Sequence, residues 1–392
     1  MQPLKGVTVV SVEQAVAAPF ATRQLADLGA RVIKIERPGG GDFARSYDTT
    51  VRGLSSYFVW LNRSKESLTL DLKRPEAAGV LARLLAQADV FVQNLAPGAA
   101  DRIGTAASAL RQQYPRLIVC TVSGYGADGP YSAKKAYDLL VQGEVGLVSI
   151  TGSEDAPAKA GISVADIAAG MYAYSGILTA LLVRASTGRG TAIDVSLFDA
   201  MTEWMAQPAL FAGYGGTPPP RAGANHASIA PYGPFRAGDG GTIALGIQNA
   251  REWSAFCEHV LGQPALAADA RFNTNSARVR NRAALHAAIE SAFAAMSTAR
   301  VIERLESAGI AWARVNTIAE FLEHPQLTGR NCQRAVGSPA GPLQVSLPPV
   351  RMEGVEPAMG DVPALGQHTD AILAELGVAD ATLAAWRKEG VI

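Results

Sequence analysis

Asp166 is the residue whose surroundings most strongly suggest chemistry. It lies in the segment Gly161-Ile-Ser-Val-Ala-Asp166-Ile-Ala-Ala-Gly170 and directly precedes a long apolar stretch, Ile167 to Val183. An Asp at such a position can cap a helix by accepting hydrogen bonds from its first N–H groups. The helix dipole also favours the ionised carboxylate there, and an ionised carboxylate is the form that acts as a nucleophile in covalent catalysis. The two interpretations, helix cap and nucleophile, are compatible.

The histidines and cysteines do not form a second reactive set. The histidines never pair as H-x-x-x-H, so we expect no metal site; they are His226, His259, His286, His324 and His368. The three cysteines, Cys120, Cys257 and Cys332, lie far apart and form no C-x-x-C. This usage is typical of a reduced, cytoplasmic protein without disulfides.

Composition excludes several classes of function. The chain has 392 residues, of which 48% are hydrophobic and 18% charged, which is typical of a globular protein of about two domains. Lys+Arg and Asp+Glu both number 35, so there is no basic excess for nucleic acid or an acidic membrane surface. The N-terminal segment, MQPLKGVTVVSVEQ, does not resemble a signal peptide. The stretch from Ile167 to Val183 is slightly short for a membrane span and contains polar side chains, so we expect a buried core helix.

Strand-like and helical segments alternate from Gly6 to Val122, which predicts a parallel α/β sheet. The expected strands are 6–12, 30–36, 67–72, 90–92 and 117–122, and the expected helices are 19–28 and 75–87. Glu36 ends the second strand, as the ribose-binding acid of a dinucleotide fold would. The first turn, Glu13 to Pro19, contains no glycine, however. A pyrophosphate needs glycines there for close approach, so NAD or FAD binding is disfavoured.

Composition changes after Met205, and Tyr214-Gly-Gly-Thr-Pro-Pro-Pro220 has the character of a linker. A strand at 242–247 and helices at 251–261, 283–295 and 298–309 then predict a smaller α+β domain. An extended Pro-rich segment, 339–349, and a short helix, 369–377, follow. We therefore expect a large domain in residues 1–205, a small domain with its linkers in 206–335, and a return to the large domain in 336–392.

Several segments together resemble the class III CoA-transferases, the formyl-CoA/carnitine-CoA transferase type. They are Leu25-Ala-Asp-Leu-Gly-Ala-Arg-Val-Ile-Lys-Ile-Glu-Arg-Pro-Gly39, Leu61-Asn-Arg-Ser-Lys-Glu-Ser-Leu-Thr-Leu-Asp-Leu-Lys73, Gln93-Asn-Leu-Ala-Pro-Gly98, Ser123-Gly-Tyr-Gly-Ala-Asp-Gly-Pro130, Tyr137-Asp138, Asp166, Leu245-Gly-Ile-Gln-Asn249, Glu252-Trp253, Asp269-Ala-Arg-Phe272 and Leu365-Gly-Gln-His-Thr-Asp370. The resemblance implies an α/β fold with a Rossmann-like large domain built from both chain ends and an inserted smaller α+β domain. It also implies an interlinked homodimer.

The resemblance gives Asp166 the role of nucleophile. Its carboxylate would attack an acyl-CoA thioester, and an aspartyl-CoA thioester would then pass CoA to an acceptor acid through mixed anhydrides, with no tightly bound cofactor. Related racemases place a His, as one half of an acid–base pair, where this chain has Tyr137. Tyrosine has a pKa near 10 and is a poor proton shuttle at neutral pH, which favours the transferase over an isomerase. A non-catalytic acyl-CoA-binding protein is the third hypothesis.

The resemblance also assigns binding residues. Those expected on CoA are Arg37, Lys73, Asn94, Leu95, Arg102 and Lys135, and Arg and Lys suit its phosphates because charge-assisted hydrogen bonds are strong. Each basic residue could instead be an ordinary surface charge. Gly215-Gly216 and Gly223-Ala-Asn-His226-Ala-Ser228 match the position of an active-site lid in relatives, or else form an interdomain linker.

The first turn and the segment Gly41–Arg45 most resemble the branch that acts on short dicarboxylates. The expected donor is succinyl-CoA, and the expected acceptor is itaconate, mesaconate or citramalate. Val16 stands where some relatives carry a glutamine that orients the substrate carbonyl, which argues against oxalate or formyl-CoA. Arg45, Arg52 and Arg63 are the candidates to hold the distal carboxylate, since Arg forms bidentate pairs with carboxylates.

Overall fold

The computed structural model describes residues 1–392, which fold into two compact units. The first unit comprises Met1–Val145, Gly161–Met205 and Thr328–Ile392, and the second comprises Gly146–Ala160 and Ala206–Leu327. The expected change of domain after Met205 coincides with a boundary between units. The return to the first unit occurs at Thr328 instead of 336, and residues 146–160 belong to the second unit.

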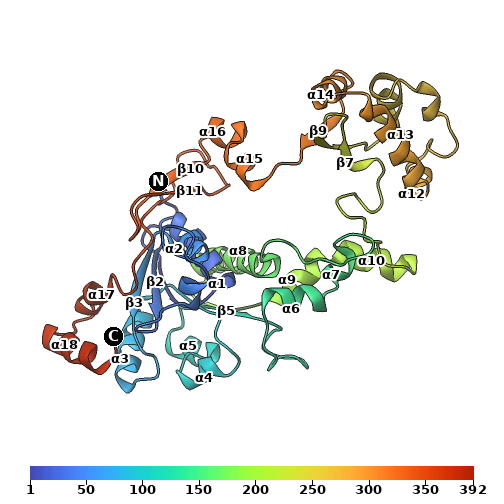
Figure 1. Ribbon diagram of the computed structural model, residues 1–392. Helices are drawn as coiled ribbons and strands as arrows, with labels where there is room; N and C mark the ends of the chain where they lie inside the picture. Colours follow the sequence, from blue (N-terminus) through green and yellow to red (C-terminus); the bar gives the residue numbers. More distant parts are fainter. The chain divides into compact units, whose positions relative to one another are not determined.

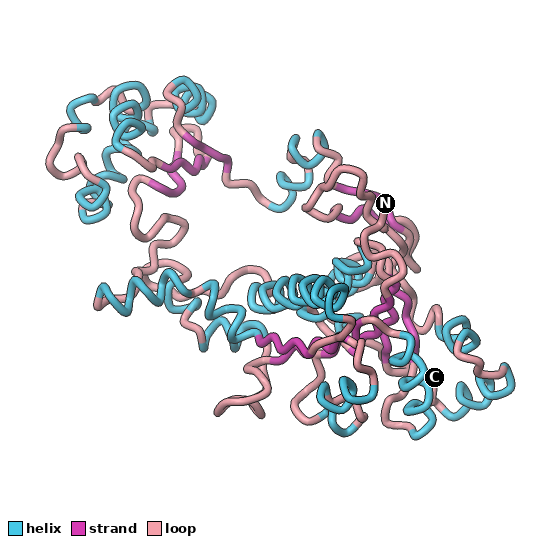
Figure 2. The backbone as a smooth tube through the Cα atoms, turned by 180° about the vertical axis from the view of Figure 1, so that it is seen from behind, coloured by secondary structure: helices cyan, strands magenta, loops and turns pink.

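The first unit contains a parallel sheet of six strands in the order β3-β2-β1-β4-β5-β6 (Figures 1 and 2). The strands are β1 Thr8–Val12, β2 Arg31–Glu36, β3 Lys65–Thr69, β4 Val90–Gln93, β5 Ile118–Ser123 and β6 Ala192–Ser196. The predicted parallel α/β fold is confirmed, and the strand order is that of dinucleotide-binding folds. Because the order reverses between β1 and β4, their carboxyl ends form the switch point where open α/β sheets bind ligands.

The sequence prediction missed β6 and placed β3 two residues too late at its start and three too late at its end. Lys65 and Glu66 begin β3, where the pattern predicted a start at Ser67. The helices of this unit are α1 Ala17–Asp27, the 3-10 helix η1 Phe43–Ser46, α2 Ser56–Asn62, α3 Pro75–Gln87, α4 Ala99–Arg102, α5 Ala107–Gln113, α6 Asp138–Glu144, α8 Val164–Thr187, α9 Leu197–Trp204, α17 Thr369–Glu375 and α18 Asp380–Glu389.

The two faces of the sheet differ in chemistry. On one face, apolar side chains of β1, β2 and β3 pack with α3, α5, α17 and α18 in a continuous core. In Figure 1 the two last helices lie beside α3, and the Asp71 N–H donates to the carbonyl of Val391. On the other face, beneath α1 and α2, these strands carry charged and hydroxyl side chains that are buried as well.

The helix α8 carries Asp166 in its first turn and packs against α1, α9, β5 and β6. Gly170 permits the close approach to α1, because a Cβ there would lie 2.6 Å from the carbonyl oxygen of Ala17. By length and composition alone, α8 could cross a membrane, and one third of its most apolar window is buried within the chain. The predicted core helix is thus buried only in part: residues such as Ala169 and Ala173 are buried, whereas side chains such as Leu182, 74% exposed, face outward.

The second unit has its own three-stranded antiparallel sheet in the order β7-β8-β9, with strands Tyr232–Arg236, Thr242–Gly246 and Ala311–Arg314. Its helices are α7 Leu147–Ile150, α10 Ala206–Gly215, α11 Ala250–Ala255, the π-helix η2 Phe256–Val260, the 3-10 helix η3 Pro264–Ala267, α12 Asn275–Arg280, α13 Arg282–Ala294, α14 Thr298–Ser307 and α15 Ile318–Leu322. The helix α16, Pro325–Gly329, spans the boundary. A single apolar core joins this sheet to α11, η2, α13 and α14.

The last segment of the first unit covers its surface before reaching α17. The hairpin of β10 Gln333–Val336 and β11 Leu343–Ser346 packs on Phe58 and Val59 of α2. Residues 347–368 contain no further strand or helix, and the Met1 amino group donates to the carbonyl of Gly354 (Figure 1). The chain ends therefore both contribute to this unit.

Candidate active site

Asp166 lies in the first turn of α8 but does not cap the helix. Ser163 is the N-cap, and its own side chain makes no capping hydrogen bond. The helix is capped from outside instead: the Ala165 N–H donates to Oδ1 of Asp138, at 2.8 Å. The amide of Gln142, one turn further along α6, donates to Oδ2 of Asp138 at 2.7 Å. The cap interpretation of Asp166 is thus wrong, and Asp138 does that work.

The electrostatic surroundings of Asp166 oppose ionisation. Burial, and then the negative charge of Asp138, raise the pKa of Asp166 to about 7. These two effects outweigh the favourable helix dipole, so the pKa of Asp166 lies above its ordinary value. No protein donor compensates the carboxylate, so its charge is costly. A half-buried carboxyl with a pKa near neutrality is typical of functional sites.

Tyr47 interacts electrostatically with Asp166 and belongs to a small cluster of aromatic side chains in the first unit. The pKa of Tyr47 is raised to about 12 by burial first, and then by Asp42, Asp166 and Tyr137. The ring of Tyr47 meets that of Tyr57 edge-on at 5.4 Å between centroids, and that of Phe43 at 5.7 Å. Tyr137 precedes α6 and is 66% exposed. The sequence analysis did not select Tyr47 and Tyr57. Two tyrosines on either side of a turn at Arg52 could have been taken as a sign that their rings meet.

The switch point brings together three of the predicted residues. Val16 is 2% exposed and directly precedes α1, and Asn94 and Leu95 follow β4. The side chain of Asn94 holds the first turn by two hydrogen bonds: Gln14 N–H donates to its Oδ1 at 2.9 Å, and its Nδ2 donates to the Gln14 carbonyl at 2.8 Å. The N–H of Leu95 donates to Gln93 Oε1. Asn94 therefore shapes the turn in this structure.

The four basic residues expected on CoA are all exposed. Arg37 follows β2, Lys73 follows β3, Arg102 ends α4 beyond β4, and Lys135 follows β5. Because the carboxyl ends of parallel strands meet at one edge of a sheet, all four belong to segments that leave this edge. Arg37 keeps a weak contact from Nη2 to the carbonyl of Gly41, at 3.4 Å.

The three arginines considered for a distal carboxylate have different environments. Arg63 is buried and forms a bidentate pair with Asp27, at 2.8 and 2.7 Å. Arg45 forms a bidentate pair with Glu36 and stacks over the ring of Phe58 at 3.6 Å. Arg52 is exposed, and its Nη1 donates to the carbonyl of Pro342 at 3.2 Å. Two of the three thus already hold a protein carboxylate.

His226 belongs to the second unit, where its exposed ring stacks on Tyr232 at 5.3 Å. Its loop is anchored by side chains of α12 and α13, since Arg282 donates to the carbonyl of His226 and Asn275 to that of Ser228. The α10 helix continues to Gly215, so Gly215 ends a helix and Gly216, with φ +75°, begins the connection.

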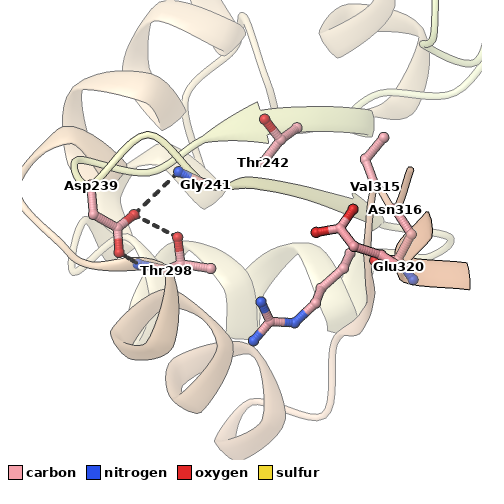
Figure 3. A pocket seen from close by; sticks show the side chains of 8 residues that line it. Asp239, Gly241, Thr242, Thr298, Val315, Asn316 and Glu320 are labelled. Atoms are coloured by element: carbon pink, nitrogen blue, oxygen red, sulfur yellow. Dashed lines mark hydrogen bonds between the residues drawn. The ribbon is translucent and has the colours of Figure 1, made fainter. Parts of the chain in front are cut away.

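The second unit also contains an open cavity of about 360 Å³, shown in Figure 3. Its acidic side chains serve the local fold: Asp239 accepts from the N–H and Oγ1 of Thr298, and Glu320 completes a capping box with Thr317. Arg314 is its basic lining residue. None of the predicted site residues lies in this cavity.

Comparison with known proteins adds a consistent set of relatives. Residues 4–369 match the sequence profile of CoA-transferase family III. The chain is 35% identical to the succinyl-CoA:glutarate CoA-transferase of Mus musculus, covering 96% of this chain and 87% of that protein. It is 36% identical to the acetyl-CoA:oxalate CoA-transferase of Acetobacter aceti, covering 88% and 89%. A succinyl-CoA:mesaconate CoA-transferase of Haloarcula hispanica is 30% identical, covering 97% and 98%.

Among solved structures, a CAIB/BAIF family protein from Brucella suis has the same fold. The two chains superpose with a TM-score of 0.83 at 35% sequence identity, covering 96% of this chain and 99% of that one. This neighbour shares the mixed α/β fold with its six-stranded parallel sheet.

Proposed function

Because the chain belongs to CoA-transferase family III, we propose that it transfers CoA from succinyl-CoA to a short dicarboxylate through covalent intermediates on Asp166. The observation that supports this mechanism most directly is the setting of Asp166. It is a half-buried carboxyl with a pKa of about 7, at the head of α8 and beside Tyr47. Raised basicity makes the ionised form a stronger nucleophile, while enough of it remains ionised at neutral pH.

The steps balance without a cofactor or a net proton. The Asp166 carboxylate attacks the thioester carbonyl, the C–S bond breaks, and CoA thiolate leaves a mixed anhydride. The thiolate attacks the Asp166 carbonyl, releasing the donor acid and forming the aspartyl-CoA thioester. The acceptor carboxylate then displaces the thiolate to form a second anhydride. The thiolate opens this anhydride at the acceptor's acyl carbon and regenerates Asp166.

The acceptor is proposed as a dicarboxylate of four or five carbons. Relatives that span nearly the whole chain are named for glutarate and mesaconate transfer, and these support that class over carnitine or aromatic acids. The relative named for oxalate means that oxalate belongs in any acceptor panel, although Val16 replaces the polar group that the oxalate-type site would use. Itaconate and citramalate complete the panel.

Arg52 is our candidate for the distal carboxylate. Arg63 and Arg45 already hold Asp27 and Glu36 in bidentate pairs, whereas Arg52 makes one hydrogen bond to a carbonyl. Replacing Arg52 by Gln should raise the KM for glutarate or mesaconate by about ten- to a hundredfold, since a charge-assisted hydrogen bond contributes about 1.5–3 kcal/mol. The KM for a monocarboxylate of equal length should not change. Equal effects on both acids would exclude Arg52 from this role.

CoA would bind at the carboxyl edge of the large sheet, with its phosphates on Arg37, Lys73, Arg102 and Lys135 and with Tyr137 near the thioester. Cys120 and Cys257 are buried and form no disulfide, which supports a reducing compartment such as the cytoplasm. The outward-facing apolar side chains of α6, α8 and α9 support a homodimer that covers them.

The decisive experiment is transfer from succinyl-CoA to the acceptor panel, followed by mass spectrometry, for wild type, Asp166→Ala and Asp166→Asn. Both variants should fold, bind CoA and lose transfer. After exposure to succinyl-CoA, a peptide containing Asp166 should carry CoA in wild type alone. Transfer by Asp166→Ala above a few per cent of wild type would exclude this nucleophile.

A further inference from the structure

The sheet face beneath α1 and α2 carries buried charges where a parallel sheet ordinarily carries apolar side chains. The strand register places Ser11 of β1 opposite Lys34 of β2, and Lys34 opposite Ser67 of β3. Glu13, Glu36 and Lys65 extend this polar face along the same three strands. The opposite face of these strands is mainly apolar, and its charges, the pair of Arg31 and Glu66, are half-exposed. The fully buried charges are therefore confined to one face, close to the switch point.

Three of these charges form one connected network with Asp42, which follows β2. Lys34 Nζ lies 2.7 Å from Asp42 Oδ2 and 3.6 Å from Glu13 Oε1, and Lys65 Nζ lies 2.7 Å from the same Glu13 oxygen. Lys65 also donates to the carbonyl of Pro19 in α1. All four side chains are buried. Two positive and two negative charges cancel, and removing one partner alone would leave a buried, uncompensated charge.

Stability does not explain why such a network is present. Buried ion pairs are often no more stabilising than apolar side chains of similar volume, because desolvation offsets the attraction. Their best-attested use is to specify one conformation. The relevant question is which conformation this network specifies.

The network ends on the turn between β1 and α1. The other oxygen of Asp42, Oδ1, accepts from the N–H of Ala15 at 3.0 Å and from that of Ala44 at 2.9 Å. Ala15 has φ +62°, the left-handed region that residues other than glycine rarely adopt. Such a conformation costs about 1 kcal/mol or more and persists only where its surroundings hold it. Asn94 holds the neighbouring Gln14 from the other side.

Asp42 is itself fixed on all sides. Its N–H donates to Glu36 Oε2 at 3.0 Å, and Glu36 is held by Arg45 and by the hydroxyl of Ser67. Lys34 fixes the remaining carboxylate oxygen. Because Asp42 is fixed by the interior of the sheet, it can hold the N–H of Ala15 in one defined position.

We propose that Asp42, held by Lys34, is a positioning residue that keeps the β1–α1 turn in its left-handed form, preformed for the acyl-CoA substrate. This inference rests on the proposed function only for the identity of the ligand. Neither side chain touches the substrate: both are buried beneath the turn, and they act through the Ala15 backbone.

Two charge-neutral double variants separate this role from the energy of the ion pair. Lys34→Met with Asp42→Asn removes both charges but retains a side-chain oxygen that accepts from Ala15. Lys34→Met with Asp42→Ala removes both charges and the acceptor. Glu66→Gln, which breaks the half-exposed pair between Arg31 of β2 and Glu66 of β3, is a matched control away from the turn.

The measurements are amide exchange of the peptide containing Glu13–Val16, CoA binding, and kcat and KM for succinyl-CoA. We expect the Ala-containing double variant to exchange at least tenfold faster in this peptide than the Asn-containing one. Its KM for succinyl-CoA and its Kd for CoA should both rise about tenfold, while Glu66→Gln resembles wild type. Equal exchange and equal CoA binding in the two double variants would overturn the proposal.

Asp42→Glu is the second test, should the Ala-containing variant not fold. It keeps the charge beside Lys34 and displaces the oxygen from Ala15, so exchange should rise and CoA binding weaken by the same tenfold. Wild-type exchange and binding in Asp42→Glu would count against the proposal. Both readouts are measured without turnover. Absence of transfer in the wild-type enzyme would therefore refute the proposed function and leave this test intact.

Discussion

Asp166 and Asp138 are two carboxyl groups at the head of one helix, and their environments assign them different tasks. Asp138 accepts the N–H of Ala165 and the amide of Gln142, so its charge is compensated. Asp166 is half-buried, lies near the negative charge of Asp138 and has no compensating protein donor, so its pKa rises to about 7. The compensated carboxyl holds the helix, and the uncompensated one is basic enough to react.

The pH dependence of the first acyl transfer follows from this pair. A raised pKa means that Asp166 is protonated below about pH 7, and a protonated carboxyl cannot attack a thioester. The kcat/KM for succinyl-CoA should therefore fall about tenfold per pH unit below that value. Asp138→Asn removes the neighbouring charge but keeps an oxygen for the Ala165 N–H, so the acid limb should move to lower pH.

Asp199→Asn is the control for this profile, because Asp199 also lies in the first turn of a helix but is exposed on α9. Its profile should match that of wild type. An acid limb that stays in place in Asp138→Asn would show that Asp138 does not set the basicity of the nucleophile. A kcat/KM for succinyl-CoA that does not change from pH 8 to pH 5 would show that ionisation of Asp166 does not control the rate.

The family resemblance predicted a catalytic role for Asp166, but the sequence could not supply this electrostatic setting. The charge that raises the pKa of Asp166 comes from another helix, and the cap that Asp166 was expected to provide comes from there too. Arg63 illustrates the same limit, since Asp27, which holds its guanidinium in a bidentate pair, lies 36 residues away. Such long-range pairings leave no local pattern.

Among the elements, those with clear apolar periodicity were predicted best. The helix α3 occupies the predicted residues 75–87, and β1, β2, β4 and β5 lie within a residue or two of their predicted bounds. The strand β3 was misplaced because its first residues are charged and nevertheless buried. In β2, the charged residues Lys34 and Glu36 alternate with apolar ones. This alternation in the sequence indicates a sheet face that carries polar side chains.

The pairing of α8 with α1 determines where Asp166 sits, and Gly170 sets how closely the two helices approach. A Cβ at Gly170 would meet the Ala17 carbonyl oxygen at 2.6 Å and Phe20 at 3.0 Å. Gly170→Ala should therefore lower the free energy of unfolding by about 1–3 kcal/mol. It should also reduce transfer, because Asp166, the proposed nucleophile, moves with α8.

Gly143→Ala is the matched control, since Gly143 lies in α6 and a Cβ there would meet nothing within 4 Å. It should be neutral or raise the free energy of unfolding by up to about 1 kcal/mol, the helix propensity difference between Gly and Ala. Urea denaturation at one fixed protein concentration measures both variants. Equal stability of the two would mean that the α1–α8 contact tolerates expansion.

On the scale of the whole molecule, the sequence predicted an inserted segment but not its true extent. Proline and glycine marked the boundary after Met205, whereas nothing in residues 146–160 separates them from their neighbours by composition. These residues join the second unit through contacts such as the N–H of Gly223 with the Gly152 carbonyl and Arg221 with Ser153. Contacts of that kind become visible only in three dimensions.

The exposed surface gives the most direct indication of the oligomeric state. Large apolar side chains on α6, α8 and α9 face outward, among them Leu139, Leu140, Met171, Leu182 and Val183. An apolar surface of this kind is costly in water unless another protein covers it, and a second copy of this chain is the occupant that the family resemblance implies. We expect light scattering to give twice the chain mass of 40.9 kDa.

Leu182→Lys tests whether this face forms the dimer. The side chain is 74% exposed in the single chain, so a monomer would tolerate the charge, whereas a dimer interface would have to bury it without a partner. We therefore expect Leu182→Lys to shift the mass towards the monomer and to make the thermal midpoint depend more steeply on protein concentration. Val350→Lys, at a residue 71% exposed outside these helices, should leave both unchanged. A wild-type protein that is a stable, active monomer would refute the dimer, and a Leu182→Lys dimer of unaltered stability would place the interface elsewhere.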